Sequence, residues 1–137
     1  MTSVVTPALR LTGAALTVAM ALIHLYLWGD GYRDLATIGV LFLLNGVIGL
    51  ALAAALLGTP RRFLAGVAAA TALFTAGTLG ALVLSLTTGL FGFRETVDAR
   101  LVVTTLVVET AGVLVLAALT LRARPRPEPR RGTQGPS

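Results

Sequence analysis

The sequence contains no cysteine and no lysine, and only 12% of its residues are charged. Without cysteine, the chain has no disulfides, no thiolate nucleophiles and no cysteine metal ligands. Its single histidine is too few for bis-histidine haem ligation within one chain, and His24 with one carboxylate falls short of a zinc site. The stretch "GLFGFRE" lacks the lysine and the strand–helix context of a phosphate-binding loop. The sequence therefore predicts no metal and no cofactor.

What the chain does contain is mostly apolar: 55% of the residues are hydrophobic, and the mean hydropathy is +0.86. Soluble domains are typically about a quarter charged, and a chain of this length cannot hide so much apolar surface in its own interior. We therefore expect lipid to be the solvent of this protein. The net charge of +5 does not indicate nucleic acid, because the arginines lie mostly at the ends of apolar runs and in the C-terminal tail.

Four apolar runs are long enough to cross a hydrocarbon core, which takes about 20 helical residues. We expect membrane spans at four places: 11–28, 35–57, 63–91 and 101–121. The third run is the longest, and we expect it either to overhang the bilayer or to end near Thr88–Gly89. These spans predict an all-α membrane protein with a bundle of four transmembrane helices over 11–121.

The distribution of arginine predicts the orientation in the membrane. If residues 1–10 are cytoplasmic, eight arginines lie inside and three lie outside, which fits the positive-inside rule. Both termini are therefore predicted to be cytoplasmic, in a plasma-membrane protein. The tail at 122–137 is rich in arginine and proline, so we expect it to be disordered and to contact anionic lipids.

A cleaved secretory signal is an alternative for the first run. Arg10, the apolar residues from Leu11 and the "AMA" at 19–21 resemble a signal with a cleavage site. The apolar run nevertheless continues to Tyr26 and Trp28, which are typical of the aromatic belt at a membrane interface. We therefore favour an intact span.

Two similar phrases, "GYRD" at 31–34 and "GFRE" at 92–95, follow long apolar runs. We interpret them as outer corners of two helical hairpins, related by a parallel pseudo-repeat about an axis along the membrane normal. The alternative is that turns at a membrane surface collect glycine, aromatic residues and arginine anyway. The charged residues of the phrases are the outer-corner candidates: Arg33, Asp34, Arg94 and Glu95.

Each predicted helix carries one polar residue in its outer half: His24, Asn45, Ser85 and Glu109. At 1.5 Å per residue they lie about 6, 15, 9 and 12 Å below the outer helix ends, so we expect one inward-facing cluster. An ionised Glu109 would cost roughly 2.5–3.5 kcal/mol there, so it should be protonated or paired with His24 or Arg94.

A buried pair of Glu109 and His24 has the ingredients of a proton relay or of a polar-ligand pocket. The alternative is that these groups only hydrogen-bond the helices together, and we favour that role for Asn45. Ser85, His24 and Glu109 match a catalytic triad by residue type, but no nucleophile motif supports it, and we favour a role other than that of an enzyme.

The stretches "HLYLWGDGYRDLATIGVLFLLNGVIG" and "GLFGFRE…VVETAGVLVLA" resemble small four-helix membrane proteins of actinobacterial type. A looser resemblance to DoxX-like proteins concerns the fold alone. Both resemblances imply a multi-pass membrane protein, and neither implies a catalytic residue.

Two functions remain open at this point. The first is a small proton-linked transport or polar-ligand-binding module that uses His24 and Glu109. The second is a non-catalytic accessory subunit of a larger membrane complex or of a homo-oligomer. Small residues spaced by four, such as Gly49 in the second span and Gly80 in the third, suit close helix packing within the bundle or between copies.

Overall fold

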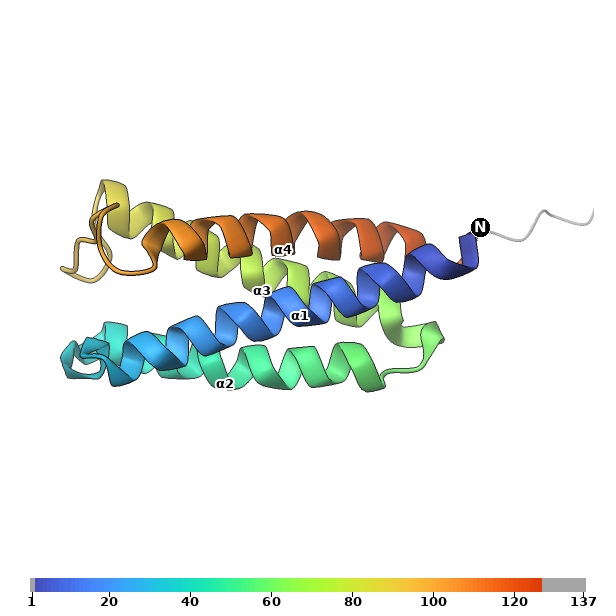
Figure 1. Cartoon of the computed structure of the whole chain (residues 1–137), viewed down its shortest axis with the longest axis horizontal. Helices are drawn as coiled ribbons and strands as arrows, with labels where there is room; N and C mark the ends of the chain where they lie inside the picture. Colours follow the sequence, from blue (N-terminus) through green and yellow to red (C-terminus); the bar gives the residue numbers. More distant parts are fainter. Residues whose placement is uncertain (1, 127–137) are drawn as a thin grey trace, which may run out of the picture.

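A computed structural model of the chain describes residues 2–126, and residue 1 and residues 127–137 are outside the described part. The described elements are α1 (Thr2–Gly29), the 3₁₀ turn η1 (Tyr32–Asp34), α2 (Ala36–Gly58), α3 (Arg61–Thr87) and α4 (Val102–Ala123) (Figure 1). Within residues 2–126 the only β-type pairing is an isolated bridge between Leu90 and Phe93. The predicted all-α four-helix bundle is therefore confirmed.

All four helices are long and apolar enough to cross a membrane, with mean hydropathies of 1.6, 2.5, 1.9 and 2.2 in chain order. Their outward faces carry large apolar side chains, for example Leu73, which is 75% exposed, and Leu114, which is 66% exposed. Such a surface is unfavourable in water but natural in lipid, where helices satisfy their own backbone hydrogen bonds. The protein is thus a multi-pass membrane protein.

Two helix ends differ from the predicted spans. Helix α1 begins at Thr2, well before Leu11, and it includes Pro7. Helix α3 ends at Thr87, close to the expected end near Thr88–Gly89 and short of Phe91, because the amides of Thr88 and Gly89 both donate to the carbonyl of Leu84. Gly89 then takes a φ of +89°, a left-handed conformation that is typical of the residue after a helix.

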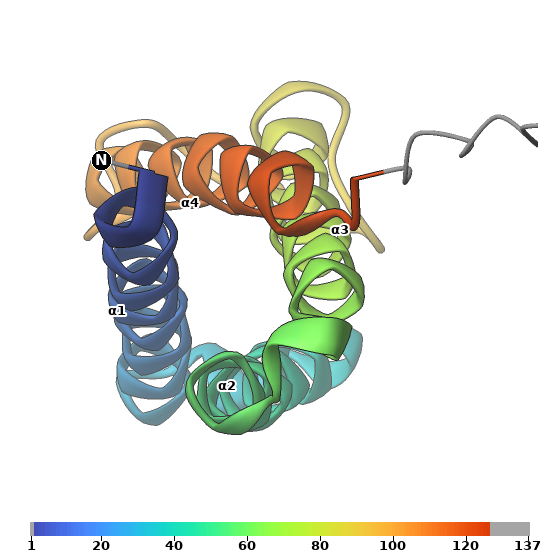
Figure 2. The same cartoon turned by 90° about the vertical axis from the view of Figure 1, so that its right-hand side faces the viewer.

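The helices form two antiparallel hairpins, α1–α2 and α3–α4, which meet mainly through α1 and α4. Helix α3 starts beside the end of α2, and the two diverge toward the opposite end of the bundle, so they contact each other little (Figures 1 and 2). The turn η1 and the segment 88–101 lie together at that opposite end, which we call the corner end (Figure 1). The buried apolar cluster includes Leu56, Leu64 and Leu116, and it lies toward the other end of the bundle, where α2 ends and α3 begins.

Small residues of α2 let it approach α1 closely. A Cβ added at Gly46 would collide with the side chain of Leu25, and one added at Gly49 would lie 2.9 Å from the Cβ of Ala21. In α3, by contrast, a Cβ at Gly80 would meet nothing within 4 Å. Packing within the bundle therefore explains the small residues of the second span, and Gly80 faces outward.

Arg10 has a structural role that its sequence position did not reveal. Its guanidinium donates hydrogen bonds to the carbonyls of Leu56, Leu57 and Thr59, the last two at 2.7 Å. These carbonyls belong to the C-terminal end of α2, where helix carbonyls lack partners within the helix. Arg10 thereby joins α1 to the end of α2, in addition to its predicted contribution to membrane orientation.

The two corners have different backbones. In the first corner Gly31 has a φ of +129° and leads directly into η1. The second corner extends over 88–101 and contains Gly92, with a φ of +77°, between the bridged residues Leu90 and Phe93. The two hairpins are present, and the pseudo-repeat between them stays a prediction.

Candidate functional site

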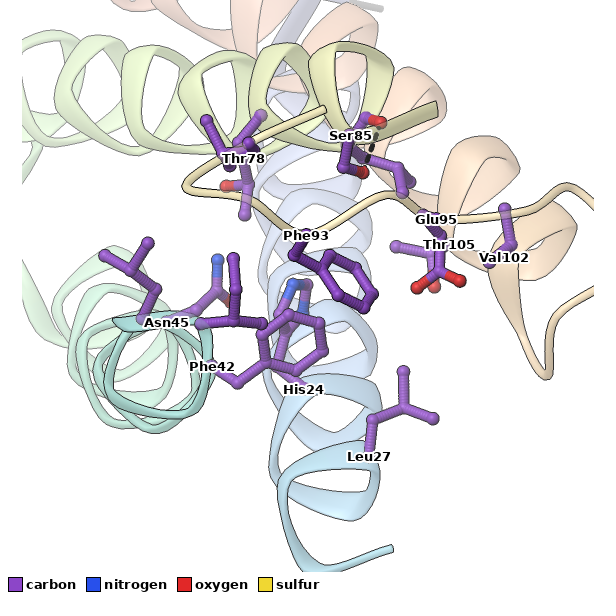
Figure 3. Close-up of a pocket in the computed structure, with 15 residues that line it drawn as sticks. His24, Leu27, Phe42, Asn45, Thr78, Ser85, Phe93, Glu95, Val102 and Thr105 are labelled. Atoms are coloured by element: carbon purple, nitrogen blue, oxygen red, sulfur yellow. Dashed lines mark hydrogen bonds between the residues drawn. The ribbon is translucent and has the colours of Figure 1, made fainter. Parts of the chain in front are cut away.

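A cavity of about 90 Å³ lies at the corner end, where residues of all four helices and of the segment 88–101 meet (Figure 3). Most of its wall is apolar. The polar lining residues are His24, Asn45, Thr78, Ser85, Glu95 and Thr105. A water needs at least about 10–15 Å³ of such volume, so the cavity has room for several waters or for the polar end of a small ligand.

His24 reaches the cavity from α1 and is only 7% exposed. Its Nδ1 lies 2.9 Å from the carbonyl oxygen of Met20, one helical turn earlier. Because a carbonyl can only accept, Nδ1 must carry a proton and donate. In a neutral ring Nε2 is then the acceptor, so the backbone of α1 fixes the tautomer and leaves Nε2 available to another group.

Glu109 on α4 is fully buried, and its Oε1 lies 3.9 Å from Nε2 of His24. Within residues 2–126 neither of its carboxyl oxygens has a hydrogen-bond partner. The distance of 3.9 Å is too long for a hydrogen bond, but a small side-chain movement would close it. One shared proton makes the pair neutral overall. The proton is either on the carboxyl group of Glu109, which then donates to Nε2, or on Nε2 of His24, which then faces the carboxylate.

Arg94 does not take the role of partner to Glu109 that the sequence allowed. Its side chain is exposed at the corner, and the described residues contain no ion pair between it and Glu109. His24 is therefore the one charged or titratable side chain that the described structure places within ion-pair distance of Glu109.

Asn45 lines the cavity from α2 and is 6% exposed. Its Oδ1 is buried and has no hydrogen-bond partner in the described part of the chain. The predicted role of Asn45 as a hydrogen-bonding link between helices is therefore not seen. Buried polar groups without a partner are uncommon and usually point to an unseen water, ion or ligand.

Ser85 lines the cavity from α3, and it also supports the corner segment. Its Oγ donates to the carbonyl of Leu82 at 2.8 Å, and its own carbonyl accepts the amide N–H of Glu95 at 2.9 Å. The hydroxyl is thus used within its own helix and not toward His24, so the structure shows no catalytic triad geometry among Ser85, His24 and Glu109.

The two corner phrases contact each other through Tyr32 and Glu95. The phenol of Tyr32 donates to Oε2 of Glu95 at 2.6 Å, and its ring stacks on Phe42 with centroids 4.6 Å apart. Burial first, and then the hydrogen bond and negative charge of Glu95, raise the pKa of Tyr32 above its ordinary value. Glu95 is 8% exposed and lines the cavity, so this outer-corner residue belongs to the site.

The other outer-corner candidates lie outside the site. Arg33 and Asp34 form an exposed ion pair at 4.0 Å. Such pairs contribute little, about 0–1 kcal/mol. A second exposed pair, Arg100 with Asp30 at 3.2 Å, links the start of α4 to the end of α1 and was not predicted. The sequence indicated this ion pair only through the opposite charges of Arg100 and Asp30, which lie at different corners.

The apolar wall of the cavity was also missed from the sequence. Phe42 of α2 and Phe93 of the corner segment line it (Figure 3). Tyr32 contacts both rings. Hydropathy alone does not distinguish such residues from those that face lipid. Within residues 2–126 no group of three or more histidine, aspartate or glutamate side chains is placed to hold a metal ion.

Comparison of the chain with known protein families, with curated proteins and with solved structures finds no match. The geometry of the site is therefore the basis for a functional proposal.

Proposed function

We propose that this protein binds a small ligand in the cavity at the corner end and couples binding to proton exchange at His24 and Glu109. The observation that carries the proposal is the state of Glu109, which is fully buried, lacks a hydrogen-bond partner in the described structure and lies 3.9 Å from His24. His24 in turn lines the cavity, so a ligand there would lie beside the proton-sharing pair.

A purely structural role explains these residues less well. Hydrogen bonds between membrane helices stabilise by about 0.6–2 kcal/mol each, but neither Glu109 nor Asn45 makes one in the described structure. A fully buried acid without hydrogen bonds destabilises its surroundings, and such residues inside membranes usually mark ligand sites or proton pathways. A functional role therefore accounts better for the burial of Glu109.

We infer that the cavity lies in the outer half of the plasma membrane and that both termini are cytoplasmic. The start of α1 and the end of α4 lie at the same end of the bundle, away from the corner end (Figure 1). Eight of the eleven arginines belong to that end or to the tail that follows α4. Contact of the tail with anionic lipids belongs to the same proposal, and residues 127–137 are outside the described part.

The single histidine makes a direct test of the pair possible. In full-length protein with labelled histidine and no histidine tag, reconstituted in lipid nanodiscs, the NMR signals of the His24 ring report its protonation as pH changes. We expect Glu109→Gln to move the midpoint of this titration, because Glu109 is the titratable group nearest to the ring. Glu95 and Tyr32 also face the cavity region, so Glu95→Gln serves as the comparison within the site.

The control outside the site is Asp98→Asn, which removes one exposed acid from the corner segment. It should leave the His24 titration unchanged. A His24 titration that is the same with and without Glu109 would contradict the proton-sharing pair and with it the proposed function.

A second candidate function, an accessory or assembly subunit, is favoured by the outward face of α3. Of the four helices, α3 has the smallest buried share: 17% of the residues in its most apolar stretch are buried. Gly77 and Gly80 lie on it with open space at their Cβ positions. Small residues allow close approach of another helix in lipid, where packing drives association.

A further inference from the structure

We propose that the ligand of this cavity is an amphiphilic organic cation, with an ammonium head beside His24 and Asn45 and an apolar body that reaches it from the bilayer between α2 and α3. This inference rests on the ligand-binding function proposed above and names the chemical class of its ligand. Four features of the site point to it: its charge, its hydrogen-bond acceptors, its aromatic wall and the side on which it meets lipid.

The charge of the site favours a cation. Glu95 lines the cavity, Glu109 lies behind His24, and no arginine is among the lining residues. Two arginines near the corners already lie beside acids, Arg33 with Asp34 and Arg100 with Asp30. A cationic head beside His24 would lie close to the carboxyl oxygens of Glu109, whereas an anionic head would meet Glu95 and an otherwise uncharged wall.

The hydrogen-bonding groups of the cavity are acceptors that need a donor. Oδ1 of Asn45 is buried without a partner, and Nε2 of neutral His24 accepts because Nδ1 donates to Met20. A primary ammonium group carries three N–H donors, enough for Asn45 and His24 together, the two acceptors without a donor that line the cavity. A hydroxyl group carries one donor and could satisfy only one of them.

The aromatic wall offers a further contact of the same kind. Phe42 and Phe93 line the cavity, and the ring of Phe42 also lies 4.9 Å from that of His24. The faces of aromatic rings attract cations, most strongly where water is excluded.

The route to the cavity is indicated by its wall on α2 and α3. These two helices diverge toward the corner end and contact each other little (Figures 1 and 2). Leu41 of α2 lines the cavity and is 40% exposed, so this wall faces lipid. A cavity of 90 Å³ is smaller than the roughly 150 Å³ that holds a benzene molecule, so the apolar body of the ligand would remain largely in the bilayer.

Proton exchange follows from the same geometry. In the empty site Glu109 and His24 share one proton. When an ammonium head enters beside His24, its positive charge favours the carboxylate form of Glu109 and the proton is released, so the net charge of the site with its ligand is unchanged. Binding of the cation and binding of the proton therefore exclude each other at Glu109.

The test compares three probes with the same eight-carbon chain: octylammonium, 1-octanol and octanoate. Each is titrated into the full-length protein in phosphatidylcholine nanodiscs, and the His24 ring signals are followed by NMR. We expect a saturable shift with octylammonium, and at least about tenfold weaker apparent binding of 1-octanol and octanoate. A factor of ten corresponds to 1.4 kcal/mol.

Two substitutions locate the effect. Glu109→Gln should weaken octylammonium binding at least about tenfold. Asn45→Val should also weaken it, and this variant provides the test if Glu109→Gln does not fold. Asp98→Asn is the matched control, because it removes an exposed acid away from the cavity, and it should leave binding unchanged.

Equal or tighter binding of 1-octanol would overturn the cation proposal, and so would octylammonium binding that survives both Glu109→Gln and Asn45→Val. If no probe binds while the His24 titration still depends on Glu109, the cation proposal falls and the proton-sharing pair stands. If the His24 titration is independent of Glu109, both fall.

Discussion

Glu109→Met should raise the free energy of unfolding, although it removes the acid at the centre of the proposed site. Glu109 is fully buried, and both of its carboxyl oxygens lack hydrogen-bond partners in the described structure. Methionine has a similar length, is apolar and adapts to irregular space. The substitution therefore removes an unsatisfied polar group without opening a large cavity.

The magnitude follows from the contacts. A buried polar group without a partner costs about 1–3 kcal/mol, and Glu109→Met removes this cost while Nδ1 of His24 keeps its bond to Met20. Imperfect packing of the new side chain costs up to about 1.5 kcal/mol. We expect a net gain of roughly 0–2 kcal/mol for Glu109→Met.

The same substitution at the other buried glutamate should act in the opposite direction. Glu95 accepts hydrogen bonds from the phenol of Tyr32 at 2.6 Å and from the amide of Thr96 at 3.0 Å. Glu95→Met leaves both donors without their acceptor and should lower the free energy of unfolding by about 1–3 kcal/mol.

The assay is reversible unfolding in mixed micelles with increasing dodecyl sulfate, followed by far-ultraviolet circular dichroism. Wild type, Glu109→Met and Glu95→Met are compared at one pH and one protein concentration. A loss of more than about 1 kcal/mol for Glu109→Met would show that Glu109 holds the bundle together, and the reasoning from its missing hydrogen bonds would be wrong.

Two further predictions concern the corner and the helix interfaces. Tyr32→Phe should lower stability by about 1–2 kcal/mol, because Glu95 loses a donor, and the unfolding assay above measures this. The pKa of Tyr32 is raised above its ordinary value of about 10, so the stability difference between wild type and Tyr32→Phe should be complete below about pH 10. This difference should vanish as pH rises through the raised pKa. The ultraviolet absorbance of tyrosinate, wild type minus variant, should show that Tyr32 ionises late. Gly46→Leu should destabilise the α1–α2 hairpin by about 1–3 kcal/mol, whereas Gly80→Leu should leave unfolding unchanged, because an added Cβ collides with Leu25 at Gly46 and meets nothing within 4 Å at Gly80. If Gly80→Leu alters migration in native electrophoresis or co-purification with other membrane proteins, the accessory function gains support.

The four-helix architecture could be predicted because it depends on local composition. Each run of about 20 apolar residues must be helical in lipid, where unpaired backbone groups are too costly, and the corners at 31–34 and 92–95 carry glycine for the turns. The helix ends were less predictable. Capping hydrogen bonds, such as those at Leu84, ended α3 at Thr87 while the apolar run continued to Phe91.

The candidate site was predictable in part. Polarity and depth identified His24, Asn45, Ser85 and Glu109, because polar groups in an apolar span are conspicuous. Phe42 and Phe93 were not identified, because an aromatic residue that lines a cavity has the same hydropathy as one that faces lipid. The contact between Tyr32 and Glu95 joins residues 63 positions apart, and no spacing rule within one segment predicts it.

The sequence by itself determined the solvent, the number of spans and the depth of each polar side chain, since these depend on hydrophobicity and on the rise of a helix. Only the tertiary structure decided which of these side chains face one another. The rotation of each helix about its axis and the divergence of α2 from α3 are set by close packing, such as that of Gly46 on Leu25, and this packing places His24 beside Glu109 and opens the cavity next to them.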